Sequence, residues 1–140
     1  MSFLGLDYGT KRIGVARSDE LNFMAHTVGF IKHESENQVL KEIKKLADEF
    51  RVEKVVVGLP KTMKGETGTQ AEKVLLFVEY LRQNLSCPIV TWDERLTTAE
   101  AERALIAQDM SRAKRKEKRD GIAAEIMLQS YIDFLKQKES

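Results

Sequence analysis

The chain has 140 residues, a length that fits one domain able to bury a core without disulfides or a structural metal. A single cysteine excludes an internal disulfide, and no apolar run is long enough to span a bilayer. Since the first ten residues also lack the basic and apolar regions of a signal peptide, we expect a single cytoplasmic domain, residues 1–140, without membrane contact.

Charge is distributed unevenly, although the net charge is only +1. Residues 111–119 hold six basic side chains against one acidic side chain, so this segment carries +5 and leaves −4 for the rest of the chain. Such a run forms either a solvated loop or a contact with the phosphate backbone of a nucleic acid, and both interpretations stay open here. The basic residues are Arg112, Lys114, Arg115, Lys116, Lys118 and Arg119.

The first half of the chain predicts three antiparallel strands, a helix and a further strand. Short apolar runs separated by turn residues predict the strands Phe3–Asp7, Arg12–Ser18 and His26–Lys32. Ser35–Gln38 has the capping-box pattern, and apolar residues at helical spacing follow it as far as Phe50. The segment Lys54–Gly58 is apolar on both faces, as expected of a central parallel strand.

The second half predicts a loop, a helix, a strand and two closing helices. A loop from Gly58 to Gly68 precedes a helix, and Pro88 opens the strand Ile89–Trp92. Thr97–Glu100 is a second capping box, for a helix to about Ala107. After the basic loop, a last helix is expected from about Asp120 to Leu135. The residues predicted to face inward are Ala71, Val74, Leu75, Val78 and Leu81 in the first of these helices, and Ala123, Ala124, Met127, Leu128, Tyr131 and Leu135 in the last.

This order of elements predicts an α/β fold, with a mixed five-stranded sheet of three antiparallel strands and then two parallel strands, flanked by helices. Ligands of such sheets bind beyond the carboxyl ends of the parallel strands. Asp7 ends the first strand, Asp93 and Glu94 follow the fifth, and Asp120 opens the last predicted helix, whose N-terminus favours a carboxylate. Since side chains alternate along a strand, only one of Asp93 and Glu94 is expected to face Asp7.

Each of these acids also has a structural interpretation. Asp7 suits the first position of a turn, Glu94 can pair with Arg95 or Arg12, and Asp120 can be a helix N-cap. Three carboxylates without a cluster of His or Cys would suit hard cations such as Mg²⁺ or Mn²⁺. Two such ions clamp the attacking and leaving oxygens of a phosphoryl centre.

Four segments together resemble the YqgF/RuvX family of RNase H-like proteins, which are described as Holliday junction resolvases and as pre-16S rRNA nucleases. The segments are LDYGTKRIGVARSD (Leu6 to Asp19), VVVGLPKTMKGETG (Val55 to Gly68), DERLTTAEA (Asp93 to Ala101) and RDGIAAEIMLQSYI (Arg119 to Ile132). The resemblance implies an RNase H-like fold and a metal-dependent nuclease of the hydrolase class that uses Mg²⁺ or Mn²⁺. It assigns the catalytic and metal-binding acids to Asp7, Glu94 and Asp120, with Asp93 as the nearest candidate for a fourth carboxylate.

The partner is then a nucleic acid, either structured DNA or precursor rRNA, bound by a monomer or a homodimer. The residues expected to bind it are Lys11, Arg12, Arg95, Arg112, Lys114, Arg115 and Lys116. Two other interpretations stay open. The chain could be a nucleic-acid-binding module in rRNA maturation or transcription with little cleavage of its own, because fold does not decide function. The opening DYGTKRIGVA also resembles the phosphate-binding strand of actin-like ATPases, which need two such domains.

Overall fold

The computed structural model describes residues 1–60, 68–94 and 112–139, and in residues 112–120 and 139 it describes the backbone only. Five strands form one sheet in the order β3-β2-β1-β4-β5. The β1–β2 and β2–β3 pairs are antiparallel, whereas β4 runs parallel to both β1 and β5. The strands are β1 (Ser2–Asp7), β2 (Arg12–Ser18), β3 (Ala25–Lys32), β4 (Val52–Leu59) and β5 (Ile89–Asp93).

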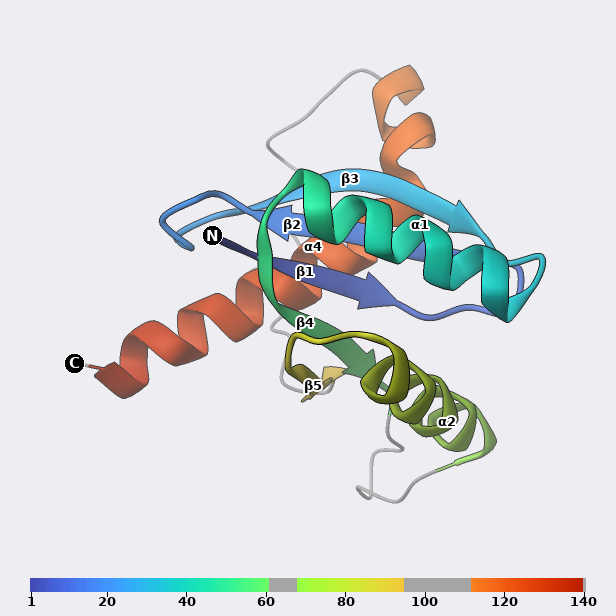
Figure 1. The fold of residues 1–140 in the computed structure, drawn as a ribbon. Helices are drawn as coiled ribbons and strands as arrows, with labels where there is room; N and C mark the ends of the chain where they lie inside the picture. The colour runs from blue at the N-terminus through green and yellow to red at the C-terminus, as the bar shows by residue number, and fades with distance from the viewer. Residues whose placement is uncertain (61–67, 95–111, 140) are drawn as a thin grey trace.

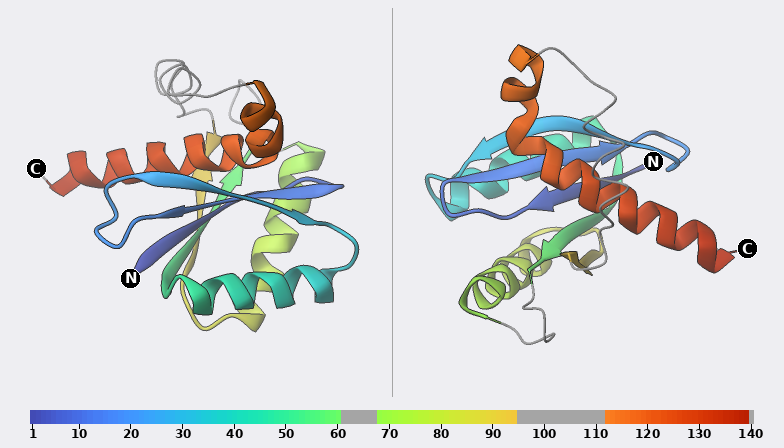
Figure 2. Two further views of the ribbon diagram at one scale, coloured as in Figure 1. Left: turned by 90° about the horizontal axis from the view of Figure 1, so that it is seen from above. Right: turned by 180° about the vertical axis from the view of Figure 1, so that it is seen from behind.

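Helices cover both faces of this sheet (Figures 1 and 2). Helices α1 (Glu36–Glu49) and α2 (Thr69–Asn84) lie on one face, over a core that includes Leu4, Leu6 and Val57. Helix α4 (Arg112–Glu139) crosses the other face, over a second core around Phe3 and Trp92. The mixed sheet predicted from the sequence is thus confirmed, with strand ends within two residues of their predicted positions.

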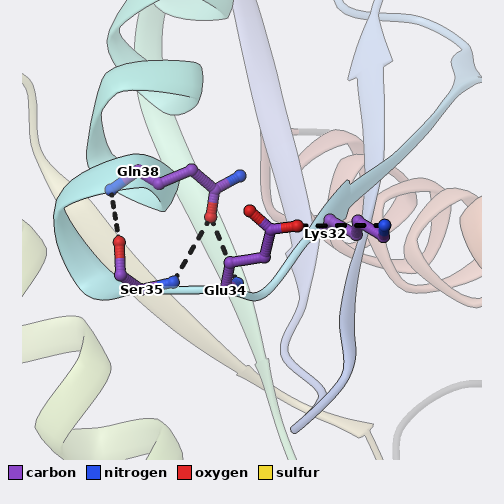
Figure 3. Close-up of polar contacts among 4 residues, drawn as sticks. All are labelled: Lys32, Glu34, Ser35 and Gln38. Carbon is purple, nitrogen blue, oxygen red and sulfur yellow. Dashed lines mark hydrogen bonds and ion pairs between the residues drawn. The ribbon is translucent and has the colours of Figure 1, made fainter.

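The predicted capping box is present at the start of α1 (Figure 3). The Gln38 backbone N–H donates to Ser35 Oγ over 3.2 Å, and the Gln38 side-chain oxygen accepts from the Ser35 and Glu34 backbone N–H groups. A surface ion pair of 3.8 Å joins Lys32 to Glu34 directly before the helix. The hydrogen bonds of the capping box satisfy backbone N–H groups that would otherwise be unpaired at the start of the helix, so they determine where α1 begins.

The predicted start of the last helix is wrong. Helix α4 begins at Arg112, so the basic segment predicted as a loop is helical and Asp120 lies inside the helix. Arginine, lysine, glutamate and alanine are strong helix formers, and neither glycine nor proline interrupts the chain from Arg112 to Asp120. The argument that a helix N-terminus would favour the Asp120 carboxylate therefore fails.

The prediction is also wrong for two residues that were expected to face inward. Leu75 in α2 is 41% exposed, and Phe77 is buried in its place. Ala123 in α4 is exposed, while Ala124, Met127 and Leu128 are buried as predicted. The predicted helix from Thr97 and most of the loop after Gly58 lie outside the described residues. None of the described helices combines the length and the hydropathy that a membrane crossing requires.

Helix α4 lies very close to β2 and β3 at Gly121. A Cβ atom added there would collide with Thr27 Cγ2 and lie 2.9 Å from the Gly29 carbonyl oxygen. Glycine in a helix interior costs about 0.5–1 kcal/mol relative to alanine. The short distance to β3 explains why glycine occupies this position, and the missing side chain allows α4 to pack closely against the sheet.

We expect Gly121→Ala to lower the free energy of unfolding by about 1–3 kcal/mol, because the added methyl group overpacks the contact with β3. Urea denaturation measures this change. Ala123→Leu is the matched control, since it enlarges an exposed side chain of the same helix and should change stability by less than about 0.5 kcal/mol. A Gly121→Ala protein more stable than the wild type would contradict the close approach.

Candidate active site

Asp7 lies at the carboxyl end of β1 on the face that α4 covers. Side chains two residues apart share a face of a strand, and a Cβ at Gly5 would contact Leu128 of α4. Asp7 therefore shares the face of Gly5. Its partner on β2 is Gly14, whose own partner on β3 is Phe30. Residues directly opposite in an antiparallel pair also share a face, so Asp7, Gly14 and Phe30 form one row across three strands.

On the other side of Asp7, Gly58 of β4 makes room for Glu94. A Cβ added at Gly58 would lie 2.6 Å from Glu94 Oε1. Glu94 directly follows β5, two residues after Trp92, which packs under α4 and pairs with Gly58. Glycines on β2 and β4 thus flank Asp7, and the one on β4 lets the Glu94 carboxyl reach across the sheet.

The carboxyl groups of Asp7 and Glu94 form a hydrogen bond with each other. Burial, the negative charge of Asp7, the shared hydrogen bond and the charge of Asp93 raise the pKa of Glu94 from 4.5 to about 7. Burial also raises the pKa of Asp7, and the hydrogen bond to Glu94 offsets part of that increase. A carboxyl pair needs a proton to form this bond, and a cation bound between the two acids would replace that proton.

The structure separates Asp93 from Glu94, as strand alternation predicted. Asp93 is the register partner of Leu59, which belongs to the core under α1 and α2, on the face opposite Trp92. Its charge still acts on Glu94. Among the described side chains, no three of the types His, Cys, Asp and Glu gather closely enough to hold a metal ion.

The turn after Asp7 is held by His33. Its Nδ1 lies 2.9 Å from the Gly9 carbonyl oxygen, and since a carbonyl only accepts, Nδ1 carries the hydrogen. The His33 backbone N–H donates to the Lys11 carbonyl oxygen over 3.0 Å, and the His33 ring packs edge-on against Tyr8. A Cβ at Gly9 would collide with the Arg12 carbonyl oxygen. The turn that carries Lys11 and Arg12 is therefore fixed at the edge of the carboxyl pair.

The structure describes the other predicted site residues only in part. Asp120 is in α4 directly before Gly121, with its side chain outside the described atoms. Arg95 lies outside the described residues. Four predicted basic residues belong to the first turns of α4, and only their backbone is described: Arg112, Lys114, Arg115 and Lys116.

Sequence reasoning missed the structural role of His33 and the position of Phe30, and it placed a loop at Gly58 without the room that this glycine makes for Glu94. Phe30 is 46% exposed and lies in the same row as Asp7. A single aromatic residue in a predicted strand does not indicate a functional site. Its position relative to Asp7 becomes known only from the strand register with Gly14.

We expect the metal-free protein to lose thermal stability between about pH 4.5 and 7 through Glu94. The pKa of Glu94 is higher in the folded state than in the unfolded state. Its contribution to the stability of the fold is therefore fully present below pH 4.5 and is lost as the pH rises through about 7. In EDTA, Glu94→Gln should reduce the decrease in Tm between pH 5 and 8 by a few degrees. The control is Glu79→Gln, at an exposed position of α2. Equal pH dependence in Glu94→Gln and wild type would argue against the shared proton.

Curated relatives match almost the whole chain. A protein of Clostridium acetobutylicum is 47% identical over 135 residues, which cover 96% of this chain and 100% of the relative. A protein of Thermoanaerobacter pseudethanolicus is 48% identical over 139 residues, covering 99% and 100%. Both carry the name "Putative pre-16S rRNA nuclease".

Solved structures share the fold at low sequence identity. RuvC of T. thermophilus, in complex with a Holliday junction substrate, has a TM-score of 0.64 at 14% identity, covering 98% of this chain and 96% of RuvC. The Fowlpox virus resolvase, with a Holliday junction DNA, has a TM-score of 0.58 at 14% identity, covering 96% and 99%. The expected RNase H-like fold is thus confirmed. A family model described as "RuvX: Holliday junction resolvase" matches residues 1–134, and together with the relatives this match shows that the chain belongs to the RuvX family.

Proposed function

We propose that this protein is a metal-dependent nuclease that hydrolyses phosphodiester bonds of structured nucleic acid in the cytoplasm. The expected substrates are precursor 16S rRNA and four-way DNA junctions, the two named for its relatives and its family. The observation that carries the proposal is the pair of carboxyl groups of Asp7 and Glu94, which lie half-buried side by side at the carboxyl ends of β1 and β5. Clefts beyond these strand ends are where ligands of such sheets bind.

The residues present fit a divalent cation. Asp7 and Glu94 offer only oxygen ligands. Burial raises the pKa values of both groups, and the charge of Asp7 raises that of Glu94 further, so a cation bound between them would favour the charged forms. Bound Mg²⁺ or Mn²⁺ would stabilise negative charge on the phosphoryl oxygens and lower the pKa of a coordinated water. Asp7 and Glu94 would hold the ion, while rigid β1 and the room at Gly58 keep their carboxyl groups together.

Asp120 is proposed as the third acid because of the path of α4. The next residue, Gly121, lies against the carbonyl oxygen of Val15, whose partner on β1 is Leu6, directly before Asp7. Neighbouring strands are about 4.8 Å apart, so the α4 turn that contains Asp120 passes close to Asp7. Asp93, on the opposite face of β5, is not proposed as a ligand.

Basic residues around this edge are proposed to hold the polyanionic substrate. Lys11 and Arg12 lie in the turn fixed by His33, and the basic start of α4 extends beyond β3 (Figures 1 and 2). Since phosphate contacts dominate affinity for nucleic acids, these two regions would attract the substrate to an otherwise acidic site. The proposed binding residues are Lys11, Arg12, Arg95, Arg112, Lys114, Arg115 and Lys116.

We expect Asp7→Asn and Glu94→Gln each to lower the cleavage rate by more than about 100-fold, because each removes a negative charge that holds the metal. Fold and affinity for nucleic acid should be largely kept. Asp93→Asn is the matched control, adjacent to Glu94 but on the other face, and should have a smaller effect. The measurement compares cleavage of a four-way DNA junction and a precursor rRNA by highly purified proteins. Wild-type cleavage by Asp7→Asn would exclude this site.

We expect Mn²⁺ to raise the Tm of the wild type, because the unfolded chain has no preformed site. A metal concentration 100 times the Kd should stabilise the fold by about 2.7 kcal/mol. The increase in Tm should be smaller in Asp7→Asn, which is otherwise close in size and shape. If millimolar Mn²⁺ leaves the wild-type Tm unchanged and cleavage persists in EDTA, the metal mechanism fails. Absence of any metal-dependent turnover would favour the nucleic-acid-binding module.

A further inference from the structure

Phe30 is an exposed aromatic residue in the same row as the carboxyl pair. It lies two strands from Asp7, on the order of 10 Å away, with only Gly14 between them in the row. Gly14 carries no side chain, so no side chain of that row separates the Phe30 ring from Asp7. The ring is 46% exposed at the edge strand β3.

The Arg12 guanidinium lies over this ring, with its carbon 5.1 Å from the ring centroid. Arg12 pairs with Lys32 of β3, so two basic side chains lie on one side of the ring, and the acidic pair lies two strands away on the other. A planar aromatic surface next to phosphate-binding charge matches a nucleotide, which has a flat base and a negative backbone. An apolar protein partner would gain nothing from those two charges.

The edge of β3 is a poor template for pairing with a strand of another protein. The β2–β3 register shifts between Val15 and Ala16, and Gly29, directly before Phe30, has a φ of 144°. Such bulges twist an edge and interrupt its ladder of hydrogen bonds. We therefore expect a ligand at this position to contact the exposed ring of Phe30 and not to pair with the backbone of β3.

We propose that Phe30 and Arg12 form a stacking platform for an unpaired nucleobase next to the scissile phosphate, so that the enzyme prefers substrates with unstacked nucleotides at the cleavage point. The inference rests on the proposed nuclease function and adds the substrate class. In a paired duplex the base faces are covered by their neighbours, so a base must leave the stack to reach the ring. Arg12, which is exposed at the start of β2, would hold the phosphate of that nucleotide on the side of the ring that leads to Asp7.

The test compares Phe30→Leu with wild type on two labelled probes, a fully paired duplex and the same duplex with a short unpaired bulge. Each probe is prepared once in DNA and once in RNA, and binding is measured in EDTA by fluorescence anisotropy. Loss of base–aromatic stacking should weaken binding of the bulged probe by at least about fivefold. Binding of the paired duplex should change by less than twofold, and Phe30→Trp should restore the preference for the bulge.

Phe23→Leu is the matched control, because Phe23 is 52% exposed and has a lysine, Lys136, 4.7 Å from its ring centroid at the other end of the β2–β3 hairpin. It should bind both probes as the wild type does. Equal losses in Phe30→Leu and Phe23→Leu, or equal losses on both probes, would overturn the platform. If the wild type cleaves and binds the bulge but Phe30→Leu matches it, only the platform fails. A wild type that binds neither probe would overturn the proposed function as well.

Discussion

The site depends on two half-buried carboxyl groups that the fold holds within hydrogen-bonding distance of each other. Asp7 is the last residue of a strand with both faces covered, and Glu94 reaches it from the end of β5. Because burial penalises both charges, the pKa of each group is raised, that of Glu94 to about 7. Packing that served stability alone would separate these groups. Their juxtaposition is instead typical of a site that binds a cation.

Glycines make this arrangement possible, and each does so by leaving out a side chain. Gly58 gives Glu94 its path to Asp7, and Gly121 lets α4 lie directly on β2 and β3. Gly14 leaves the surface between Asp7 and Phe30 without a side chain. A hydrophobic residue at any of these positions would add to the core, but it would close the space beside Asp7 or lift the helix that carries Asp120.

Local patterns in the sequence were sufficient for most of the fold. The apolar runs of the strands and the capping box at Ser35 specify elements through contacts between near neighbours, and these predictions are confirmed. Asp7 could be chosen as the end of a buried strand, and alternation separated Asp93 from Glu94. Alternation alone could not tell which of the two faces Asp7, because that depends on how β5 is oriented beside β4.

The errors arose where two local signals conflict and only tertiary packing decides. In α2, Leu75, Leu76 and Phe77 are consecutive and apolar, so helical periodicity cannot select the inward residue. In α4, the dense positive charge suggested a loop and Asp120 suited a helix N-cap, whereas intrinsic helix propensity favours continuation back to Arg112. Gly121 is a contact point with β3 rather than a helix boundary, and that contact joins residues far apart in the sequence.

The edge position of β3 connects the acidic pair to the choice of substrate. An exposed aromatic residue on an edge strand is a liability, because it invites association with other chains. Here the bulge, the unusual backbone of Gly29 and the charges of Arg12 and Lys32 reduce that risk while leaving the ring accessible. Burying Phe30 under a longer neighbouring side chain would remove the liability at once, but such a side chain at position 14 would also stand beside Asp7. The same face of the sheet thus carries the half-buried carboxyl pair and, two strands away, an exposed aromatic ring for the adjoining base.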